Sequence, residues 1–335
     1  MLKVCVIGMG PIGNTHSTVY KSLPNVELAA VCDRVPQRAE EGGKKYGVPF
    51  YYDAQKMLSE IKPDMCSVAT GGYEYSSDHY LATIQALEAG CHVLCEKPIS
   101  NDLECAAKMV ETAKKLNRCF GIDFNHRFTP AALHAKKWQN EGRLGDLIFI
   151  NMALWIGKFM PLDSEYYHLK ALNPHSVDMM RYYCGDIEEV MCYAMKAPGR
   201  DIWSTASINM KFKNGIVGHL TSSYDIERGH PMERCEVAGT MGRMLIEDMW
   251  RESTLFPRGD MVKEVYTNPV FGGYEGFFDT FKARITAIVN QIDNGAIPDE
   301  IDGKGSDGLE ASRVIHAAIE SLKTGKPICV ADITK

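Results

Sequence analysis

The first 125 residues alternate between short apolar runs and longer segments with a helical spacing of apolar side chains. The apolar runs are almost continuous, which is typical of strands in a parallel sheet covered on both faces. One helix-like segment ends at Gly90, a residue type that commonly stops a helix. This alternation predicts a doubly wound α/β domain with right-handed crossovers. The expected strands are 3–8, 26–32, 64–70, 92–96 and 119–123, and the clearest helices are 75–89 and 103–116.

The pattern changes after residue 126. A helix-like segment at 130–141 precedes a long strand candidate at 146–157, and both faces of that strand are largely apolar, so we expect it to be covered on both sides. Short glycine-containing turns such as 213–215 join further strand-like runs and are typical of hairpins. The later segments are expected strands at 188–195, 205–212, 216–223, 233–238 and 243–247, and expected helices at 277–294 and 306–324.

These patterns predict an α/β chain of two domains. The first, 1–125, has a doubly wound parallel sheet, and the second, 126–335, is an α/β domain with a large mixed or antiparallel open sheet. We expect the two late helices to return and pack on the first domain.

Charge, apolar content and cysteine usage exclude several classes of protein. The 335 residues include 37 Lys and Arg against 43 Asp and Glu, a formal net charge of −6, and no basic run, so nucleic acid is not an expected partner. No apolar run reaches the ~18–20 residues that a membrane-spanning helix needs. A strand begins at once, so we expect no signal peptide. Eleven dispersed cysteines without a C-x-x-C pair indicate buried thiols in a reducing cytoplasm, with no metal site.

A glycine-rich turn at 8–13 has the pattern G-x-G-x-x-G, follows the first strand and opens a helix. In that context it is typical of a dinucleotide-binding turn, with the pyrophosphate at the helix N-terminus. Asp33 stands 20 residues after Gly13, where a carboxylate accepts a hydrogen bond from a ribose hydroxyl and favours NAD, while Arg34 leaves NADP open. A plain turn followed by a capping Asp is the alternative interpretation. The expected cofactor residues here are Gly8, Gly10, Pro11, Ile12, Gly13, Asp33 and Arg34.

Polar residues also follow two later strands of the first domain. The strand 92–96 ends in Glu96-Lys97-Pro98, and the carboxyl edge of a parallel sheet is where ligands bind. Lys97 is therefore a candidate for contact with a substrate hydroxyl, or else an ordinary surface lysine. Asn125 and Arg127 follow the next strand, and we expect the former near the cofactor and the latter near cofactor or substrate.

The segment 172–181 reads as the start of a helix, with Asn173 as the N-cap and Pro174 at the first helical position. His175 would then lie in the first turn, where the helix dipole lowers the pKa of a histidine, and Asp178 would share its face. A neutral imidazole is a competent proton acceptor. The alternative is a histidine that merely packs at a helix end.

Together, Glu96-Lys97-Pro98, the turn 8–13 and the segment 121–128 resemble the glucose–fructose oxidoreductase / inositol dehydrogenase family (Gfo/Idh/MocA), over essentially the whole chain. The resemblance implies a Rossmann domain followed by an α/β domain whose open sheet makes oligomer contacts, here a homodimer or homotetramer. It implies that Lys97 is the catalytic lysine. Further cofactor residues implied by the resemblance are Thr70, His79, Glu96 and Lys97 itself.

In the second domain the family pattern is D-x-x-x-H-x-x-D, with the histidine as acid/base. His175 and Asp178 match its second half, but Ala171 stands in place of the first Asp, so the specificity of inositol dehydrogenases transfers only in part. His168, Tyr166 and Tyr167 in the preceding loop are the candidates to supply the missing polar group, and the alternative is that each is a loop residue without direct substrate contact. Softer candidates are Trp155, which either stacks on a sugar or packs in the core, the turn residue His230, and the loop 268–275, which we expect to help close the site.

The resemblance implies an NAD(P)-dependent oxidoreductase that transfers hydride between nicotinamide and a secondary alcohol of a cyclic sugar, glycoside or polyol. His175 would accept the hydroxyl proton, and Lys97 would stabilise the developing alkoxide. Two alternatives stay open: a redox-neutral glycosidase that uses tightly held NAD, and a non-catalytic sensor that binds nucleotide or sugar. Retention of both Lys97 and His175 argues against the sensor.

Overall fold

The computed structural model describes residues 1–72, 78–157, 164–227, 232–269 and 276–334. The chain divides into two compact units. Unit 1 consists of Met1–Phe124 and Phe277–Glu310, and unit 2 consists of Asn125–Gly276 and Ala311–Thr334. The long helix α9, Gly305–Thr324, begins in the first and ends in the second.

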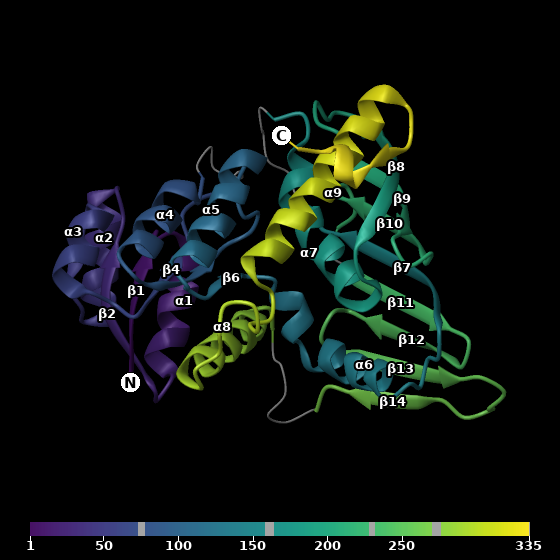
Figure 1. Ribbon diagram of the computed structural model, residues 1–335, viewed down its shortest axis with the longest axis horizontal. Helices are drawn as coiled ribbons and strands as arrows, with labels where there is room; N and C mark the ends of the chain where they lie inside the picture. Colours follow the sequence, from purple (N-terminus) through teal and green to yellow (C-terminus); the bar gives the residue numbers. More distant parts are fainter. Residues whose placement is uncertain (73–77, 158–163, 228–231, 270–275, 335) are drawn as a thin grey trace. The chain divides into compact units, whose positions relative to one another are not determined.

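Unit 1 contains a six-stranded sheet in the order β3-β2-β1-β4-β5-β6 (Figure 1), and all of its strand pairs are parallel. The order reverses between β1 and β4, the place where open α/β sheets bind ligands. This confirms the predicted doubly wound fold. The strands are β1 Leu2–Ile7, β2 Val26–Cys32, β3 Phe50–Tyr51, β4 Met65–Val68, β5 His92–Cys95 and β6 Phe120–Ile122.

The helices of unit 1 follow the predicted alternation. The helix expected over 75–89 is α4, Tyr80–Glu88, and residues 73–77 lie outside the described part of the chain. Its N-terminal bound is therefore later than the pattern indicated. The other helices are α1 Pro11–Ser22, α2 Pro36–Tyr46, α3 Ala54–Ile61, α5 Leu103–Lys115 and α8 Phe278–Asp293.

The helix α8 belongs to the core of unit 1 although it comes late in the sequence. Its residues Phe281, Ile285, Ile288 and Val289 are buried in one cluster with strand residues such as Val4. Their spacing places all four on one helical face. Burial of each such side chain contributes about 1.5–3 kcal/mol, which is what holds α8 to this unit.

Unit 2 contains a nine-stranded sheet in the order β14-β13-β12-β11-β7-β10-β9-β8-β15. Only β7 and β10 pair in parallel among the described strands, so the sheet is mixed, as predicted. The strands are β7 Leu147–Trp155, β8 Ile187–Met195, β9 Thr205–Phe212, β10 Val217–Ser223, β11 Glu233–Gly239, β12 Gly242–Glu247, β13 Glu252–Pro257, β14 Glu264–Thr267 and β15 Ile328–Cys329. The helical elements are α6 Pro130–Asn140, α7 Tyr167–Cys184 and the short 3-10 turns η2 Asn125–Phe128 and η3 Val330–Asp332.

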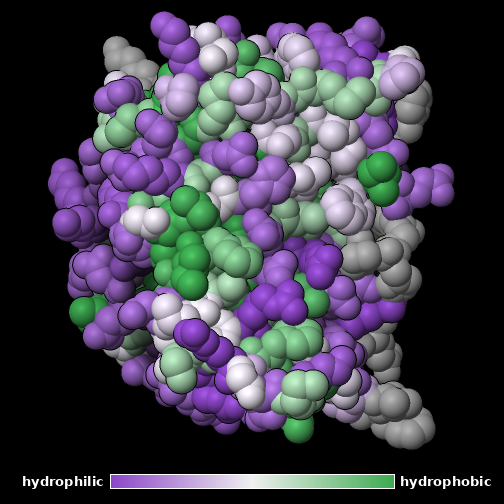
Figure 2. Space-filling model, turned by 90° about the vertical axis from the view of Figure 1, so that its right-hand side faces the viewer, coloured by the Kyte–Doolittle hydropathy of each residue, from purple (hydrophilic) through white to green (hydrophobic). Residues whose placement is uncertain are grey.

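In the part of the chain that the structure describes, helices cover one face of this sheet, and the other face carries exposed and half-buried side chains. Ile150, Met152 and Leu154 of β7 are buried on the face where α7 packs, whereas Asn151 is exposed and Phe149 only half-buried on the opposite face. The expectation that β7 is covered on both sides is therefore wrong for the single chain. Figure 2 views the molecule from the side of these strands and shows apolar patches among polar residues.

The cysteines and the apolar helices of the structure bear on two expectations from composition. The eleven cysteines are free thiols; Cys105 and Cys329 are partly exposed and the others are buried, as predicted from their apolar settings. Among the described helices, none combines the length and apolar character that crossing a membrane requires.

Candidate active site

The turn between β1 and α1 has the close packing that its glycines predict. Gly8 has a φ of +96°, and a Cβ there would lie 2.5 Å from the Ala69 carbonyl oxygen. A Cβ at Gly13 would lie 1.7 Å from the Gly8 oxygen, so α1 can approach β1 only with glycine at that position.

Gly10 has a different surrounding from the other two glycines. Among the described residues nothing lies within 4 Å of a Cβ built there, and no side chain caps the N-terminus of α1 at this residue. The space beside Gly10 at the N-terminus of this twelve-residue helix can therefore accommodate a phosphate, which helix N-termini bind. The turn thus fits a dinucleotide pyrophosphate.

Asp33 ties the end of β2 to this turn. Its carboxylate accepts hydrogen bonds from the backbone N–H of Met9 (2.7 Å) and from that of Val35 (2.8 Å). The side chain therefore has the turn-capping role that was the alternative interpretation. A carboxylate has about four lone-pair positions, so Asp33 can also accept a hydrogen bond from a ribose hydroxyl. Arg34, the residue beside it, is exposed.

The histidine expected at the cofactor, His79, has both ring nitrogens beside main-chain carbonyl oxygens. His79 is 1% exposed, and its Nδ1 lies 2.8 Å from the Pro98 carbonyl oxygen and its Nε2 3.0 Å from that of Thr70. Both ring nitrogens are thus engaged with main chain, so His79 holds the turn after β5 against the end of β4. Thr70 in turn donates its hydroxyl to the Asp78 carbonyl (3.1 Å). The Lys97–Pro98 peptide bond in this turn is cis, and the Lys97 side chain is half-buried.

A buried charge network lies directly behind Lys97. His16 on α1 places Nε2 3.1 Å from Glu96 Oε1 and 3.1 Å from Asp123 Oδ2, and its Nδ1 lies 2.7 Å from the Ser67 hydroxyl. Burial lowers the pKa of His16, but Asp123 and Glu96 outweigh it and raise that pKa to about 9. Burial and Asp123 raise the pKa of Glu96, opposed by His16 and Lys97.

This network changes the interpretation of Glu96, which we expected at the cofactor. Its carboxylate is engaged with His16 inside unit 1. Neither His16 nor Asp123 was among the residues singled out from the sequence, because no local spacing relates them. A histidine and two carboxylates are also a set of metal ligands. A cationic imidazole has no lone pair to offer a metal, so we interpret the cluster as an ion network.

In unit 2, the helix that carries His175 begins earlier than predicted. α7 runs over Tyr167–Cys184, and Pro174 lies inside it rather than at its first position. His175 is therefore in the middle of the helix, beyond the first turn in which the helix dipole lowers the pKa of a histidine. Proline in a helix interior costs about 3 kcal/mol or more. Nearly every residue of the first four turns is buried, and that packing outweighs the local penalty.

Arg127 and Asp178, both expected at the substrate, bind each other. The guanidinium donates from Nε to Asp178 Oδ2 (2.8 Å) and from its second nitrogen to Oδ1, and both side chains are buried. The Arg127 guanidinium also lies 5.0 Å from the centre of the Tyr182 ring. A planar, two-bond pair of this kind positions helix α7 against η2. The structure thus gives both residues a structural role, and their contact with substrate stays a prediction.

The ring of His175 stacks on a second histidine that sequence analysis did not select. The centroids of His126 and His175 are 4.1 Å apart and the ring planes differ by 3°. Nδ1 of His126 lies 2.6 Å from Glu233 Oε2 at the start of β11. His126 lies within the segment 121–128 that carried the family resemblance, which is the only local signal that could have drawn attention to it.

The residues proposed to replace the missing aspartate have other surroundings. His168 is fully buried and meets the Tyr224 ring edge-on with centroids 5.0 Å apart. Burial lowers the pKa of His168 to about 3, so its ring is neutral. Tyr167 is buried as well, and Tyr166 is partly exposed. His168 therefore packs in the interior of unit 2 in this structure, and its contact with substrate stays a prediction.

The other residues named in the sequence lie in several elements of the chain. Asn125 is buried at the start of η2, and Ala171 is buried within α7. Trp155, at the end of β7, is only partly buried, so it is not a core residue. His230 lies outside the described residues, as does most of the loop 268–275.

Comparison with known proteins assigns both units. Residues 2–124 match the model of an oxidoreductase family with an NAD-binding Rossmann fold, and residues 132–245 match the GFO/IDH/MocA C-terminal domain. The chain belongs to the Gfo/Idh/MocA family. This confirms the resemblance found in the sequence, and it confirms NAD as the cofactor of the Rossmann domain.

Individual Gfo/Idh/MocA proteins extend the comparison. The chain is 38% identical to D-glucoside 3-dehydrogenase of Escherichia coli (strain K12) over 148 residues, which cover 44% of this chain and 41% of that protein. It is 25% identical over 347 residues to myo-inositol 2-dehydrogenase of Thermotoga maritima, with 99% of each chain covered. A solved levoglucosan dehydrogenase, in complex with NADH and levoglucosan, has the same fold, with a TM-score of 0.87 at 21% identity over 98% of this chain and 99% of that one.

Proposed function

We propose that this protein is an NAD-dependent dehydrogenase that oxidises a secondary alcohol of a cyclic sugar, glycoside or polyol. The observation that carries the proposal is the fixed imidazole of His175, stacked on His126 and one helical turn from the Arg127–Asp178 pair. The names of the relatives support the substrate class, because a glucoside, an inositol and levoglucosan are all cyclic compounds with several secondary hydroxyls.

The residues that would hold the dinucleotide are those of the turn 8–13 and Asp33. Bound NAD supplies the hydride acceptor, which no amino-acid side chain provides. The N-terminus of α1 would stabilise the pyrophosphate charge, and the Asp33 carboxylate would accept a hydrogen bond from a ribose hydroxyl. A carboxylate repels a 2′-phosphate, so we expect NAD to be preferred over NADP.

The protein groups then handle the proton and the developing charge. His175 accepts the hydroxyl proton, for which its ring must be neutral and correctly turned. Lys97, at the carboxyl end of β5, donates a hydrogen bond to the substrate oxygen and stabilises its negative charge. The His16–Glu96–Asp123 network and the His79 contacts keep the chain on either side of Lys97 in place.

The deciding experiment is NADH formation across a panel of sugars, inositols, glycosides and sugar acids, with wild type and Lys97→Met. We expect the variant to bind NADH as wild type does, measured by fluorescence titration, but to lose turnover. Lys108→Met removes an exposed lysine on α5 of the same unit and serves as the matched control. Wild-type turnover in Lys97→Met would overturn the mechanism.

The same panel separates the two other functions. Release of free sugar from a glycoside without net NADH would indicate a redox-neutral glycosidase. Binding of nucleotide or sugar without any product would indicate a sensor. Accumulation of ketone and NADH in equal amounts is the result that the proposal requires.

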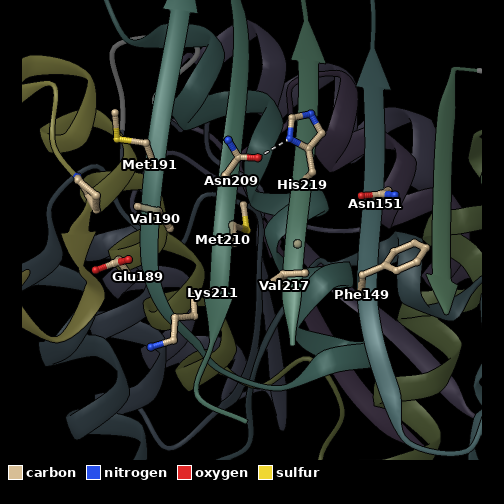
Figure 3. Close-up of a pocket in the computed structure, with 12 residues that line it drawn as sticks. Phe149, Asn151, Glu189, Val190, Met191, Asn209, Met210, Lys211, Val217 and His219 are labelled. Carbon is tan, nitrogen blue, oxygen red and sulfur yellow. Dashed lines mark hydrogen bonds between the residues drawn. The ribbon is translucent and has the colours of Figure 1, made fainter. Parts of the chain in front are cut away.

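We further propose that the open face of the unit 2 sheet binds a second copy of this chain. A groove of about 370 Å³ lies on this face, and Figure 3 shows its lining residues on neighbouring strands, with Asn209 and His219 turned toward each other. Three large apolar side chains of the same strands, Tyr193, Met195 and Val217, are more than half exposed. Exposed apolar surface on a broad sheet is typical of a contact between subunits.

A further inference from the structure

The short turn η2 is anchored before it reaches the candidate site. The hydroxyl of Thr129, which is fully buried, donates to the His126 carbonyl oxygen (3.1 Å) and lies 3.0 Å from that of Met249. The same hydroxyl accepts the Ala132 N–H at the start of α6 (3.3 Å). The backbone of His126 is therefore tied to α6 and to the segment after β12.

Two consecutive side chains of η2 then contact α7 one helical turn apart. His126 lies flat against His175, and Arg127 binds Asp178, three residues further on. Residues at i and i+3 share a helical face, so η2 holds α7 at two adjacent points. The ion pair fixes the helix, and the stacked ring contacts the side chain that we assign as proton acceptor.

The stack restricts the second side-chain torsion of His175, which sets the direction of its ring nitrogens. The second side-chain torsion of histidine is broad, so the ring of an unsupported histidine turns easily and its nitrogens change direction. A parallel ring at 4.1 Å blocks that rotation. Both rings are at least nine-tenths buried, so water does not compete for the contact.

Glu233 supports the second ring in turn. Its Oε2 lies 2.6 Å from His126 Nδ1, a close contact that lacks the alignment of a hydrogen bond, and the carboxylate is 2% exposed. The Glu233 carbonyl accepts the Asp248 N–H (2.8 Å), which ties the start of β11 to the segment after β12. Contacts therefore run from Glu233 through His126 to His175.

We propose that His126 is a positioning residue that holds the His175 ring in the orientation for accepting a proton, and that Glu233 fixes His126. This inference rests on the proposed function and deepens it. His126 transfers no proton itself, so a flat ring without nitrogen should replace it, provided that the ring still stacks on His175.

The first test compares His126→Ala with His126→Phe, using myo-inositol and methyl β-D-glucopyranoside as probes. Loss of the stack should lower kcat about 10- to 100-fold in His126→Ala with little change in KM, because misplacement by about 1 Å has that effect on proton transfer. His126→Phe should stay within about threefold of wild type, since phenylalanine offers the same flat face. A His126→Phe variant as inactive as His126→Ala would overturn the proposal, because His126 would then handle a proton.

A matched control is available in the same unit. His134 on α6 also stacks on a ring, that of Tyr266, with centroids 4.5 Å apart. His134→Ala removes a stacked histidine outside the candidate site and should leave kcat and KM at wild-type values. A fall of kcat in His134→Ala equal to that in His126→Ala would mean that the effect is general destabilisation, and would contradict a positioning role.

The second test needs no substrate. In protein with isotope-labelled histidine, the His175 ring protons should be shielded by the neighbouring ring, and we expect that NMR shift in wild type and in His126→Phe but not in His126→Ala. The His175 signals are assigned by their loss in His175→Gln. Unchanged His175 shifts in His126→Ala would overturn the inference. If no probe in the panel is turned over, the proposed function fails while this measurement still decides the inference.

The third test examines Glu233 and also covers the case in which His126→Ala does not fold. Glu233→Gln should lower kcat in the wild-type background, because the His126 ring loses its carboxylate partner. In the His126→Phe background, where no ring nitrogen can use Glu233, the same substitution should have no further effect on kcat. Equal losses in both backgrounds would contradict the proposed chain of contacts.

Discussion

The guanidinium of Arg127 binds both carboxylate oxygens of Asp178, and this buried pair joins η2 to the middle of α7. The two residues are 51 positions apart in the sequence. Because His126 precedes Arg127 and His175 lies three residues before Asp178, the pair sets the distance at which the two histidine rings meet. Loss of the Arg127–Asp178 pair should therefore also disturb the contact between the two histidine rings.

We expect Arg127→Met to lower the free energy of unfolding by about 3–5 kcal/mol, since it leaves the Asp178 carboxylate buried without its partner. The double variant Arg127→Met/Asp178→Leu should recover a large part of that loss, because no unpaired charge remains. Urea unfolding of the three proteins measures both effects. A double variant less stable than Arg127→Met would show that the pair is not the source of the loss.

The free energy of unfolding of unit 1 should fall at alkaline pH, because the His16 ring then loses its proton. Its pKa is raised from 6.5 to about 9 in the folded chain, so folding favours the protonated ring. That contribution is complete below pH 6.5 and is lost as the pH rises through about 9. At ~1.4 kcal/mol per pKa unit it amounts to about 3 kcal/mol.

Urea unfolding at several pH values across this window tests the prediction against His16→Gln. The variant carries no titrating ring at this position, so its stability should depend less on pH than that of wild type. The raised pKa of Glu96 acts with the same sign but begins near the ordinary value of that carboxyl, 4.5. Parallel pH curves for wild type and variant would show that His16 is not protonated in the folded protein.

The preference for NAD over NADP should depend on the charge of Asp33. In Asp33→Asn we expect the KM for NAD to rise about 10-fold, because a hydrogen bond to a charged acceptor contributes about 1.5–3 kcal/mol, and the KM for NADP to rise less. Asp53→Asn changes an aspartate that caps α3 in the same unit and should leave the ratio unchanged. An unaltered ratio of the two KM values in Asp33→Asn would remove Asp33 from the ribose site.

The open sheet face predicts self-association that a single charge can disrupt. Val217 on β10 is 56% exposed and lines the groove of Figure 3, so Val217→Glu should shift the chain toward monomer in light scattering coupled to size exclusion. Met261 is fully exposed between β13 and β14, which makes Met261→Glu a control of equal charge that should not change the mass. A wild-type chain that is monomeric at high concentration would refute the proposed contact.

Much of unit 1 was predictable because its signals are local. The buried strands are continuous apolar runs, and the turn 8–13 combines a tight bend with an open helix N-terminus that glycine permits. The 20-residue spacing from Gly13 to Asp33 reflects one helix and one strand. Lys97 stood out because it ends a strand at the ligand-binding edge of a parallel sheet.

The predicted start of α7 failed for a reason that is equally physical. Asn173 and Pro174 have the local preferences of a helix start, and those preferences amount to about 1–3 kcal/mol. Burial of almost every side chain before Pro174 contributes more, and burial depends on neighbours that a local pattern does not contain.

By itself the sequence determined the two sheet types and the dinucleotide-binding turn, because periodicity and spacing record which residues share a face or a turn. The roles of Lys97 and His175 are predictions that rest on the family resemblance. The tertiary structure alone decided which of these side chains are supported and by what. His16 lies 80 residues before Glu96 in the sequence, and His126 of η2 contacts Glu233 of β11. Such contacts arise when separately formed elements pack. A buried charged group needs a partner of opposite charge nearby in space, and the position of that partner along the chain does not matter.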